Sequence, residues 1–119
     1  MTLLELQSRV SKTAAFTGSG VDVSGITGDW TLKFQCESLT AAKQARWVFE
    51  DTVNDYTASL AGPTINFKGE IEASYDKVKS FKKQDFPGLR LGTASAQLRL
   101  TLSNMDSAST AIYRAWIEY

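Results

Sequence analysis

The chain has 119 residues, of which 43% are hydrophobic and 22% are charged, a composition typical of one soluble globular domain whose core needs no disulfide. Thirteen basic residues balance thirteen acidic ones, which argues against a protein that coats nucleic acid or an anionic membrane. Because the chain has no histidine and one cysteine, it cannot form Ser-His-Asp or Cys-His catalytic sites, His-ligated metal sites or zinc fingers.

Residues 1–28 differ from the rest of the chain. They contain four glycines, three leucines near the start, and no strong alternation before Val21. This pattern predicts either an extra edge strand or an extended arm that becomes ordered against a partner. The start lacks the basic residues and apolar run of a secretory signal, and no stretch is apolar enough for a membrane span. We therefore divide the chain into an N-terminal arm or edge segment, 1–28, and a β domain, 29–119.

Strong alternation with a period of two begins at Trp30 and predicts a strand over residues 30–36. Its apolar face holds Trp30, Leu32, Phe34 and Cys36. This is the pattern of a half-buried antiparallel strand. Residues 40–45 are compatible with a short helix capped by Thr40. Residues 46–53 form the next predicted strand, with Trp47 and Phe49 on one face.

The second half of the chain also alternates. A strand is predicted over residues 65–72 with Ile65, Phe67, Gly69 and Ile71 on one face, and another over residues 96–103 with Ala96, Leu98, Leu100 and Leu102 on one face. Shorter strands are predicted over residues 75–81 and 89–91. The final run, 110–119, is apolar on both faces, which indicates either a central strand or an interface.

Turn-forming residues separate these strands at fairly regular intervals. Roughly eight short strands in about 100 residues are typical of a β-sandwich or a small barrel. The predicted fold is therefore all-β, a single-domain antiparallel β-sandwich or small barrel with an extended N-terminal arm.

Cys36 and a set of oxygen-bearing side chains near Asp22 are candidate sites of chemistry. Cys36 lies in an alternating apolar run, so we expect a buried, unreactive thiol. Asp22, Ser24 and Asp29 lie in a glycine-rich loop, but their spacing does not match a calcium loop. They are expected to form turns.

Acidic residues form two further clusters. Glu70 and Glu72 share one strand face, and Glu50, Asp51 and Asp55 lie close in sequence. A pair of carboxylates can catalyse glycoside hydrolysis, but alternation predicts that Glu70 and Glu72 lie on a solvated sheet face. We expect no enzyme activity, no catalytic residue, no metal ion and no cofactor.

The three tryptophans raise the alternative of carbohydrate stacking. Trp30 and Trp47 lie on apolar strand faces and are expected in the core. Trp116 shares a face with Ile112, Arg114 and Glu118, whereas Tyr113, Ala115, Ile117 and Tyr119 share the opposite face. One of these two faces is expected to contact another subunit, because aromatic residues and arginine are enriched in interface cores.

Basic residues concentrate between residues 77 and 90, where five basic residues stand against one acidic residue. Such a segment has three interpretations: binding to nucleic acid, complementarity to an acidic protein surface, and solvation of an edge strand whose lysines block edge-to-edge pairing. The second interpretation is favoured.

Several segments resemble small β-proteins encoded among the structural genes of tailed bacteriophages. The resemblance is carried by GDWTLKF at 28–34, ESLTAAKQAR at 37–46, VFEDTVND at 48–55, DFPGLRLG at 85–92, AQLRL at 96–100 and YRAWIEY at 113–119. It covers about three quarters of the chain and includes no catalytic signature.

The resemblance implies a virion protein made in the host cytoplasm, most of all a head decoration (cement) protein on the capsid surface. Its partners would be the major capsid protein and copies of itself, since such proteins often form trimers, with no specific nucleic acid and no membrane. A tail or neck protein and a carbohydrate-binding β-module on the virion are the alternatives. Removal of residues 1–12 is expected to leave the domain folded and to weaken attachment. Partner contacts are expected at Leu3, Leu4, Leu6, Lys82, Lys83, Arg90, Tyr113, Trp116 and Tyr119.

Overall fold

A computed structural model describes residues 1–40, 45–51, 56–59, 78–86, 88–105 and 110–119. Nine strands and one short 3-10 helix form in this part of the chain. They are β1 Leu3–Lys12, β2 Phe16–Thr17, β3 Val21–Asp22, β4 Thr31–Thr40, β5 Ala45–Asp51, β6 Tyr56–Ser59, β7 Lys79–Lys82, η2 Lys83–Asp85, β8 Gln97–Met105 and β9 Thr110–Glu118.

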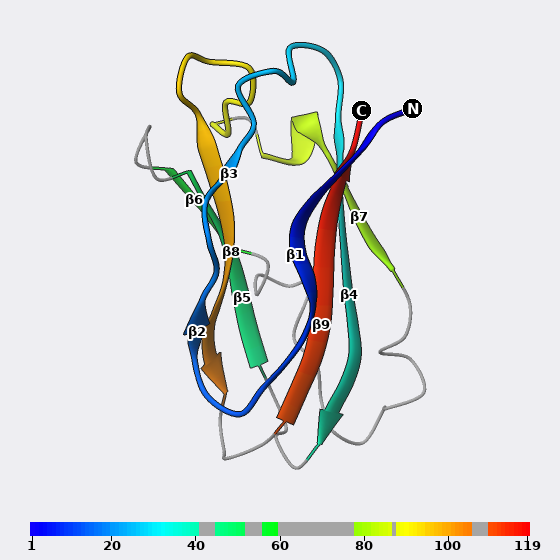
Figure 1. The fold of residues 1–119 in the computed structure, drawn as a ribbon, viewed down its shortest axis with the longest axis vertical. Helices are drawn as coiled ribbons and strands as arrows, with labels where there is room; N and C mark the ends of the chain where they lie inside the picture. The colour runs from blue at the N-terminus through cyan, green and yellow to red at the C-terminus, as the bar shows by residue number, and fades with distance from the viewer. Residues whose placement is uncertain (41–44, 52–55, 60–77, 87, 106–109) are drawn as a thin grey trace.

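The strands form two antiparallel sheets that pack face to face (Figure 1). Sheet A has four strands in the order β1-β9-β4-β7. Sheet B has five strands, ordered β2-β8-β5-β6, with β3 also pairing with β8. The predicted all-β antiparallel sandwich is confirmed.

Alternation placed the core residues correctly in the two strongly patterned strands that lie within the described residues. Leu32, Phe34 and Cys36 of β4 are fully buried. Leu98, Leu100 and Leu102 of β8, with Ala96 just before the strand, are also fully buried. Each sheet therefore turns one apolar face toward the other and leaves a polar face outside, as expected for an aligned sandwich.

An aromatic cluster joins the two sheets at the middle of the core. The rings of Phe34 from sheet A and Trp47 from sheet B have centroids 5.0 Å apart, and Tyr113 of β9 lies 5.4 Å from Trp47 in an edge-on geometry. Trp30 and Trp47 are both buried, which confirms the core role predicted for them.

The final run of the sequence forms β9, which lies in the centre of sheet A between β1 and β4. Ala111, Tyr113, Ala115 and Ile117 face the core and are fully buried. The residues between them lie on the outer face of the sheet. The apolar run at 110–119 predicted either a central strand or an interface, and the structure shows a central strand.

The N-terminal segment is an edge strand and not an extended arm. β1 pairs with β9 from Leu3 opposite Glu118 to Lys12 opposite Ala111, and Leu6 belongs to the core. β2 and β3 then cross to sheet B, where both pair with β8. The expected arm is wrong because β1 supplies core side chains and a backbone ladder that complete sheet A.

One further strand prediction is wrong, and other predicted elements fall wholly or partly outside the described residues. Residues 89–91 form no strand; they belong to a loop in which Leu89 is buried and its N–H donates to the Phe86 carbonyl at 2.9 Å. Of the strand predicted over 75–81, the structure describes β7, Lys79–Lys82. The strand at 65–72 falls outside the described residues. So do residues 41–44 of the helix predicted at 40–45, while Thr40 ends β4 and Ala45 starts β5.

Candidate functional site

The outer face of sheet A carries a concentration of aromatic and charged side chains. Register places Trp116 of β9 opposite Glu5 of β1 on one side and opposite Lys33 of β4 on the other. Because directly opposed residues point to the same side of a sheet, these three side chains share the outer face. Trp116 is half-buried there.

A shallow groove of about 480 Å³ runs along this face where β1 and β9 meet. It is lined by Leu3, Glu5, Gln7, Arg114, Ala115, Trp116 and Glu118. The groove thus combines an aromatic ring and an aliphatic side chain with three charged groups.

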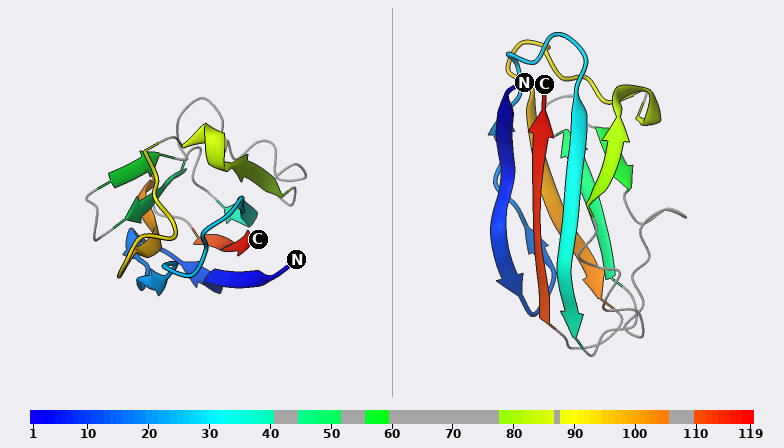
Figure 2. Two further views of the ribbon diagram at one scale, coloured as in Figure 1. Left: turned by 90° about the horizontal axis from the view of Figure 1, so that it is seen from above. Right: turned by 90° about the vertical axis from the view of Figure 1, so that its right-hand side faces the viewer.

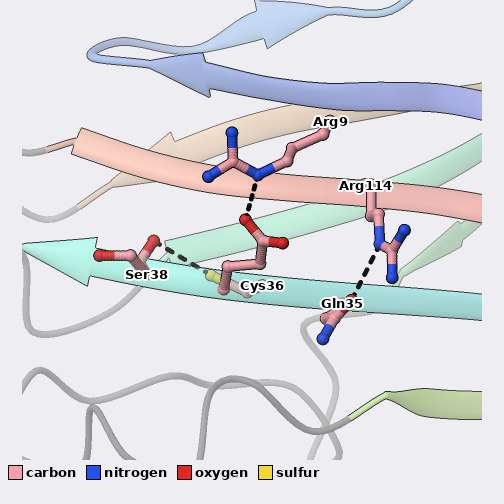
Figure 3. Close-up of polar contacts among 6 residues, drawn as sticks. Arg9, Gln35, Cys36, Ser38 and Arg114 are labelled. Carbon is pink, nitrogen blue, oxygen red and sulfur yellow. Dashed lines mark hydrogen bonds and ion pairs between the residues drawn. The ribbon is translucent and has the colours of Figure 1, made fainter.

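Polar contacts hold the Trp116 side chain in place. Its indole N–H donates to Glu118 at 3.0 Å, and the Arg114 guanidinium lies 4.8 Å from the ring centroid, within the range of a cation–π contact. Arg114 Nε in turn donates to Gln35 at 2.9 Å, a bond that links β9 to β4 (Figure 3). The ring is therefore oriented before any partner binds.

Further ion pairs cross the same face. Arg9 of β1 pairs with Glu37 of β4, reaching over β9. Lys33 lies 4.0 Å from Glu118 and donates to the Ser80 hydroxyl at 2.8 Å. Such exposed contacts add little stability each, but together they fix the charge pattern of the face.

The structure separates the residues predicted to contact partners into three groups. Leu3 and Trp116 both line the groove. Leu4 is half-buried on the other side of β1, where it packs against the core. Lys82, Lys83, Arg90 and Tyr119 are exposed. Leu6 and Tyr113 are buried in the core, so their side chains do not reach the surface and their assignment as contacts is wrong. Side chains alternate along a strand, so Leu6 points to the side opposite Glu5 on β1, and Tyr113 points to the side opposite Trp116 on β9.

The sequence alone groups some residues of the groove and not others. Arg114 and Glu118 alternate with Trp116 on one strand, so the sequence places them on the same candidate contact face. Glu5 and Gln7 lie more than 100 residues away in sequence. Only the pairing of β1 with β9 brings these two residues to Trp116.

The basic segment of the sequence lies at the opposite edge of sheet A. η2 and the following turn are anchored by Phe86, whose ring packs 5.5 Å from Phe81, and by buried Leu89. This anchoring leaves the side chains of Lys83 and Arg90 exposed. The segment therefore presents its positive charge from a fixed backbone.

The other candidate groups have structural roles. Cys36 is buried, as expected; burial raises the pKa of its thiol to about 12, and Sγ donates to the Ser38 carbonyl at 3.4 Å (Figure 3). Asp22 accepts from the backbone N–H and hydroxyl of Ser24 at 2.9 and 2.6 Å, which forms the predicted turn and lowers the pKa of Asp22.

Only part of the two acidic clusters falls within the described residues. Glu50 accepts from Arg99 at 2.5 Å, and Asp51 is buried. Asp55, Glu70 and Glu72 lie outside the described residues. Among the side chains that the structure places, no three His, Cys, Asp or Glu residues cluster as metal ligands would.

Comparison with known proteins adds no family. No protein-family model, no curated protein and no solved structure matches this chain. In the part of the chain that the structure describes, no helix has the length and apolarity needed to span a membrane.

Proposed function

We propose that the protein is a structural component of a tailed-bacteriophage particle, a decoration protein that binds the outer surface of the major capsid protein lattice and stabilises the head. The sequence resemblance suggests this class of partner. The observation that carries a role in protein contact is the outer face of sheet A, where Trp116 and Leu3 line one groove. An oriented aromatic side chain ringed by charged groups is typical of protein interfaces.

In this proposal the stabilisation works by mass action. A protein that binds assembled shells and not free subunits shifts the equilibrium toward the shell. Each copy needs only a modest interface, on the order of 1,000 Å² or more, because many copies bind one shell.

The basic segment gives the proposal a specific charge test. Lys83 and Arg90 are exposed on an anchored backbone, so they are suited to steer the protein toward an acidic surface. Purified protein would be mixed with empty shells of the same phage, and the bound fraction measured after pelleting. The wild-type protein is expected to pellet with the shells, and Lys83→Glu to pellet several-fold less at low salt.

Arg46→Glu is the matched control. Arg46 is also exposed, and its substitution makes the same charge change on β5 of sheet B. The difference between the two variants is expected to shrink as salt rises. A wild-type protein that stays in the supernatant at all salt concentrations would overturn the proposal.

The carbohydrate-binding alternative depends on an open tryptophan face. Trp47 is fully buried and cannot stack on a sugar. Trp116 is half-buried, and Arg114 lies over its ring. A stacking sugar would have to displace this guanidinium or use the other side of the ring, so the protein-contact role is the better supported one.

A further inference from the structure

The large hydrophobic side chains that the structure exposes lie beside the edges of sheet A. They are Met1 at 96%, Leu3 at 64%, Val78 at 43% and Tyr119 at 42% exposure. Leu3 belongs to β1. Tyr119 forms backbone hydrogen bonds with Thr2, the residue just before Leu3. Val78 directly precedes β7. In the described part of the chain, exposed apolar surface thus occurs at both ends of the strand order.

β1 and β7 are the two outermost strands of sheet A (Figure 2). Within this sheet, β1 pairs only with β9 and β7 pairs only with β4. Successive antiparallel pairs make β7 antiparallel to β1. A second copy shifted sideways in the plane of the sheet would therefore bring its β1 antiparallel to β7 of the first. No rotation of one copy relative to the other is needed to match strand direction.

The rows of the sheet also match. Leu3, Glu118, Thr31 and Lys82 form one row across the four strands, and Glu5, Trp116, Lys33 and Ser80 form another. In the shifted copy, Leu3 would lie opposite Lys82 and Glu5 opposite Ser80. The outer-face side chains of one copy would therefore lie beside the outer-face side chains of the other.

Backbone groups at the two edges are oriented for such pairing. Thr2 and Tyr119 exchange two backbone hydrogen bonds, of 2.5 and 2.9 Å, so alternation turns the N–H and C=O of Leu3 and Glu5 away from β9. On β7, the Lys82 N–H donates to the Asp85 carboxylate at 2.7 Å and not to β4. Alternation then turns the N–H and C=O of Ser80 to the outer edge as well. Pairing with Leu3 of the next copy requires the Lys82 N–H to exchange its bond with Asp85 for one with the Leu3 carbonyl.

Register irregularities confine the regular edge of β1 to its first residues. The pairing with β9 shifts between Glu5 and Gln7 and again between Gln7 and Val10. Bulges of this kind discourage edge pairing, so the segment suited to it is short. Leu3–Glu5 is about as long as the four residues of β7.

The charges of the two edges are opposite. Glu5 is exposed and makes no ion pair with any residue that the structure describes, and Glu118 lines the same groove. β7 carries exposed Lys79 and Lys82. A lysine opposite Leu3 would extend over the groove toward these carboxylates, so lysine and glutamate side chains are opposed across the junction. The Asp85 carboxylate also lies at the β7 edge, bonded to the Lys82 N–H.

From these observations we infer that copies of this chain associate head to tail, with the β1 edge of one copy adding to the β7 edge of the next to form a continuous antiparallel sheet. Lys82 of one copy lies beside Glu5 of its neighbour. This interface is heterologous, so it produces a ring if the rotation closes and a filament if it does not. The inference goes beyond the proposed function, which names only the capsid lattice as partner, and it requires no capsid.

Charge exchange gives the first test, with mass in solution measured by sedimentation over a concentration series. Wild-type protein is expected to self-associate. Glu5→Lys and Lys82→Glu are each expected to weaken association about tenfold at low salt, because every junction then opposes like charges. Asp29→Lys, the same charge change at an exposed loop residue, is the control and should associate like wild type.

Mixing the two variants separates this interface from other arrangements. Every junction in an alternating assembly of Glu5→Lys and Lys82→Glu chains pairs opposite charges, so the mixture is expected to recover wild-type association. In a two-fold contact of β1 with β1, Lys82 lies outside the interface, so Lys82→Glu alone would associate like wild type. A contact elsewhere would be weakened by neither variant. Failure of rescue, or a wild-type protein that stays monomeric at all concentrations, would overturn the inference.

A backbone variant gives the second test. Leu3→Pro removes an N–H that points away from β9, so the isolated chain should keep its fold while association falls at least about tenfold. Thermal unfolding checks the fold. If the Leu3→Pro chain is folded and associates like wild type, the inference is wrong. Shell binding without self-association would retain the capsid role and reject this interface, and self-association without shell binding would do the reverse.

Discussion

The placement of β1 in sheet A predicts that its buried leucine stabilises the whole domain. Leu6 is 5% exposed and Leu3, on the same strand, is 64% exposed. The two substitutions Leu6→Ala and Leu3→Ala remove the same atoms from sites that differ in burial. A leucine-to-alanine change in a core costs about 2–5 kcal/mol of unfolding free energy, whereas an exposed one stays within about 0.5 kcal/mol.

Because Leu6 lies in an edge strand that can relax toward solvent, we expect its loss to fall near the lower end, about 2–3 kcal/mol. Small domains are stable by about 5–15 kcal/mol. Deletion of residues 1–12 also removes half-buried Leu4 and Val10, both packed against the core, and the ladder to β9. The deletion is therefore expected to unfold most of the protein, opposite to what a detachable arm would do.

Urea denaturation followed by tryptophan fluorescence measures these effects, since buried Trp30 and Trp47 report on the core. The midpoint for Leu6→Ala should drop while that for Leu3→Ala should match wild type, with similar slopes. Equal midpoints for the two variants, or a cooperatively folded deletion of residues 1–12 as stable as the full chain, would refute the placement of β1 in the core.

Three further predictions concern single groups. Tyr113 Oη is buried with no hydrogen-bond partner among the described residues, so Tyr113→Phe is expected to raise the unfolding free energy by about 1 kcal/mol; a clear loss in a urea titration would indicate a partner. Burial raises the pKa of Cys36 from 9.0 to about 12, so the folded state keeps a proton that the unfolded state loses. Cys36 should therefore make stability fall by up to about 1.4 kcal/mol per pH unit between these values, and Cys36→Ala should fall less steeply; parallel curves would contradict this. Gly92 has φ +84° and a Cβ there would lie 2.6 Å from the Ile26 carbonyl oxygen, so Gly92→Ala should cost about 2 kcal/mol or more. Gly25→Ala, with nothing within 4 Å, should be neutral; equal melting temperatures for the two glycine variants would refute the strain at Gly92.

The core of the sandwich could be predicted from the sequence because its signal is local. Strands β4, β5 and β8 bury the side chains that alternation assigned to their inner faces, such as Phe34, Phe49 and Leu100. Side chains of a strand alternate between the two faces of its sheet, so neighbouring residues alone reveal which ones are inside. The same argument placed Trp47 in the core and so removed it from any ligand site.

The candidate site could be predicted only in part. Trp116, Arg114 and Glu118 share a strand face, and that grouping follows from the sequence. Glu5 joins them only because β1 pairs with β9 across the whole length of the chain. The length of the loop between two strands does not reveal whether they pair, since closing a longer loop adds little free energy.

The N-terminal segment shows the same division most clearly. Its leucines and glycines predict either an edge strand or an extended arm, and the predicted fold includes the arm. Leu4, Leu6 and Val10 alternate with Glu5, Gln7 and Arg9, which groups Leu4 with the inner residues if the segment is a strand. This pattern does not show whether the segment joins the sheet. The pairing with β9 decided that, because its backbone ladder makes β1 part of sheet A. The sequence determined which residues could be buried, and the long-range pairing of strands decided which surfaces they left exposed.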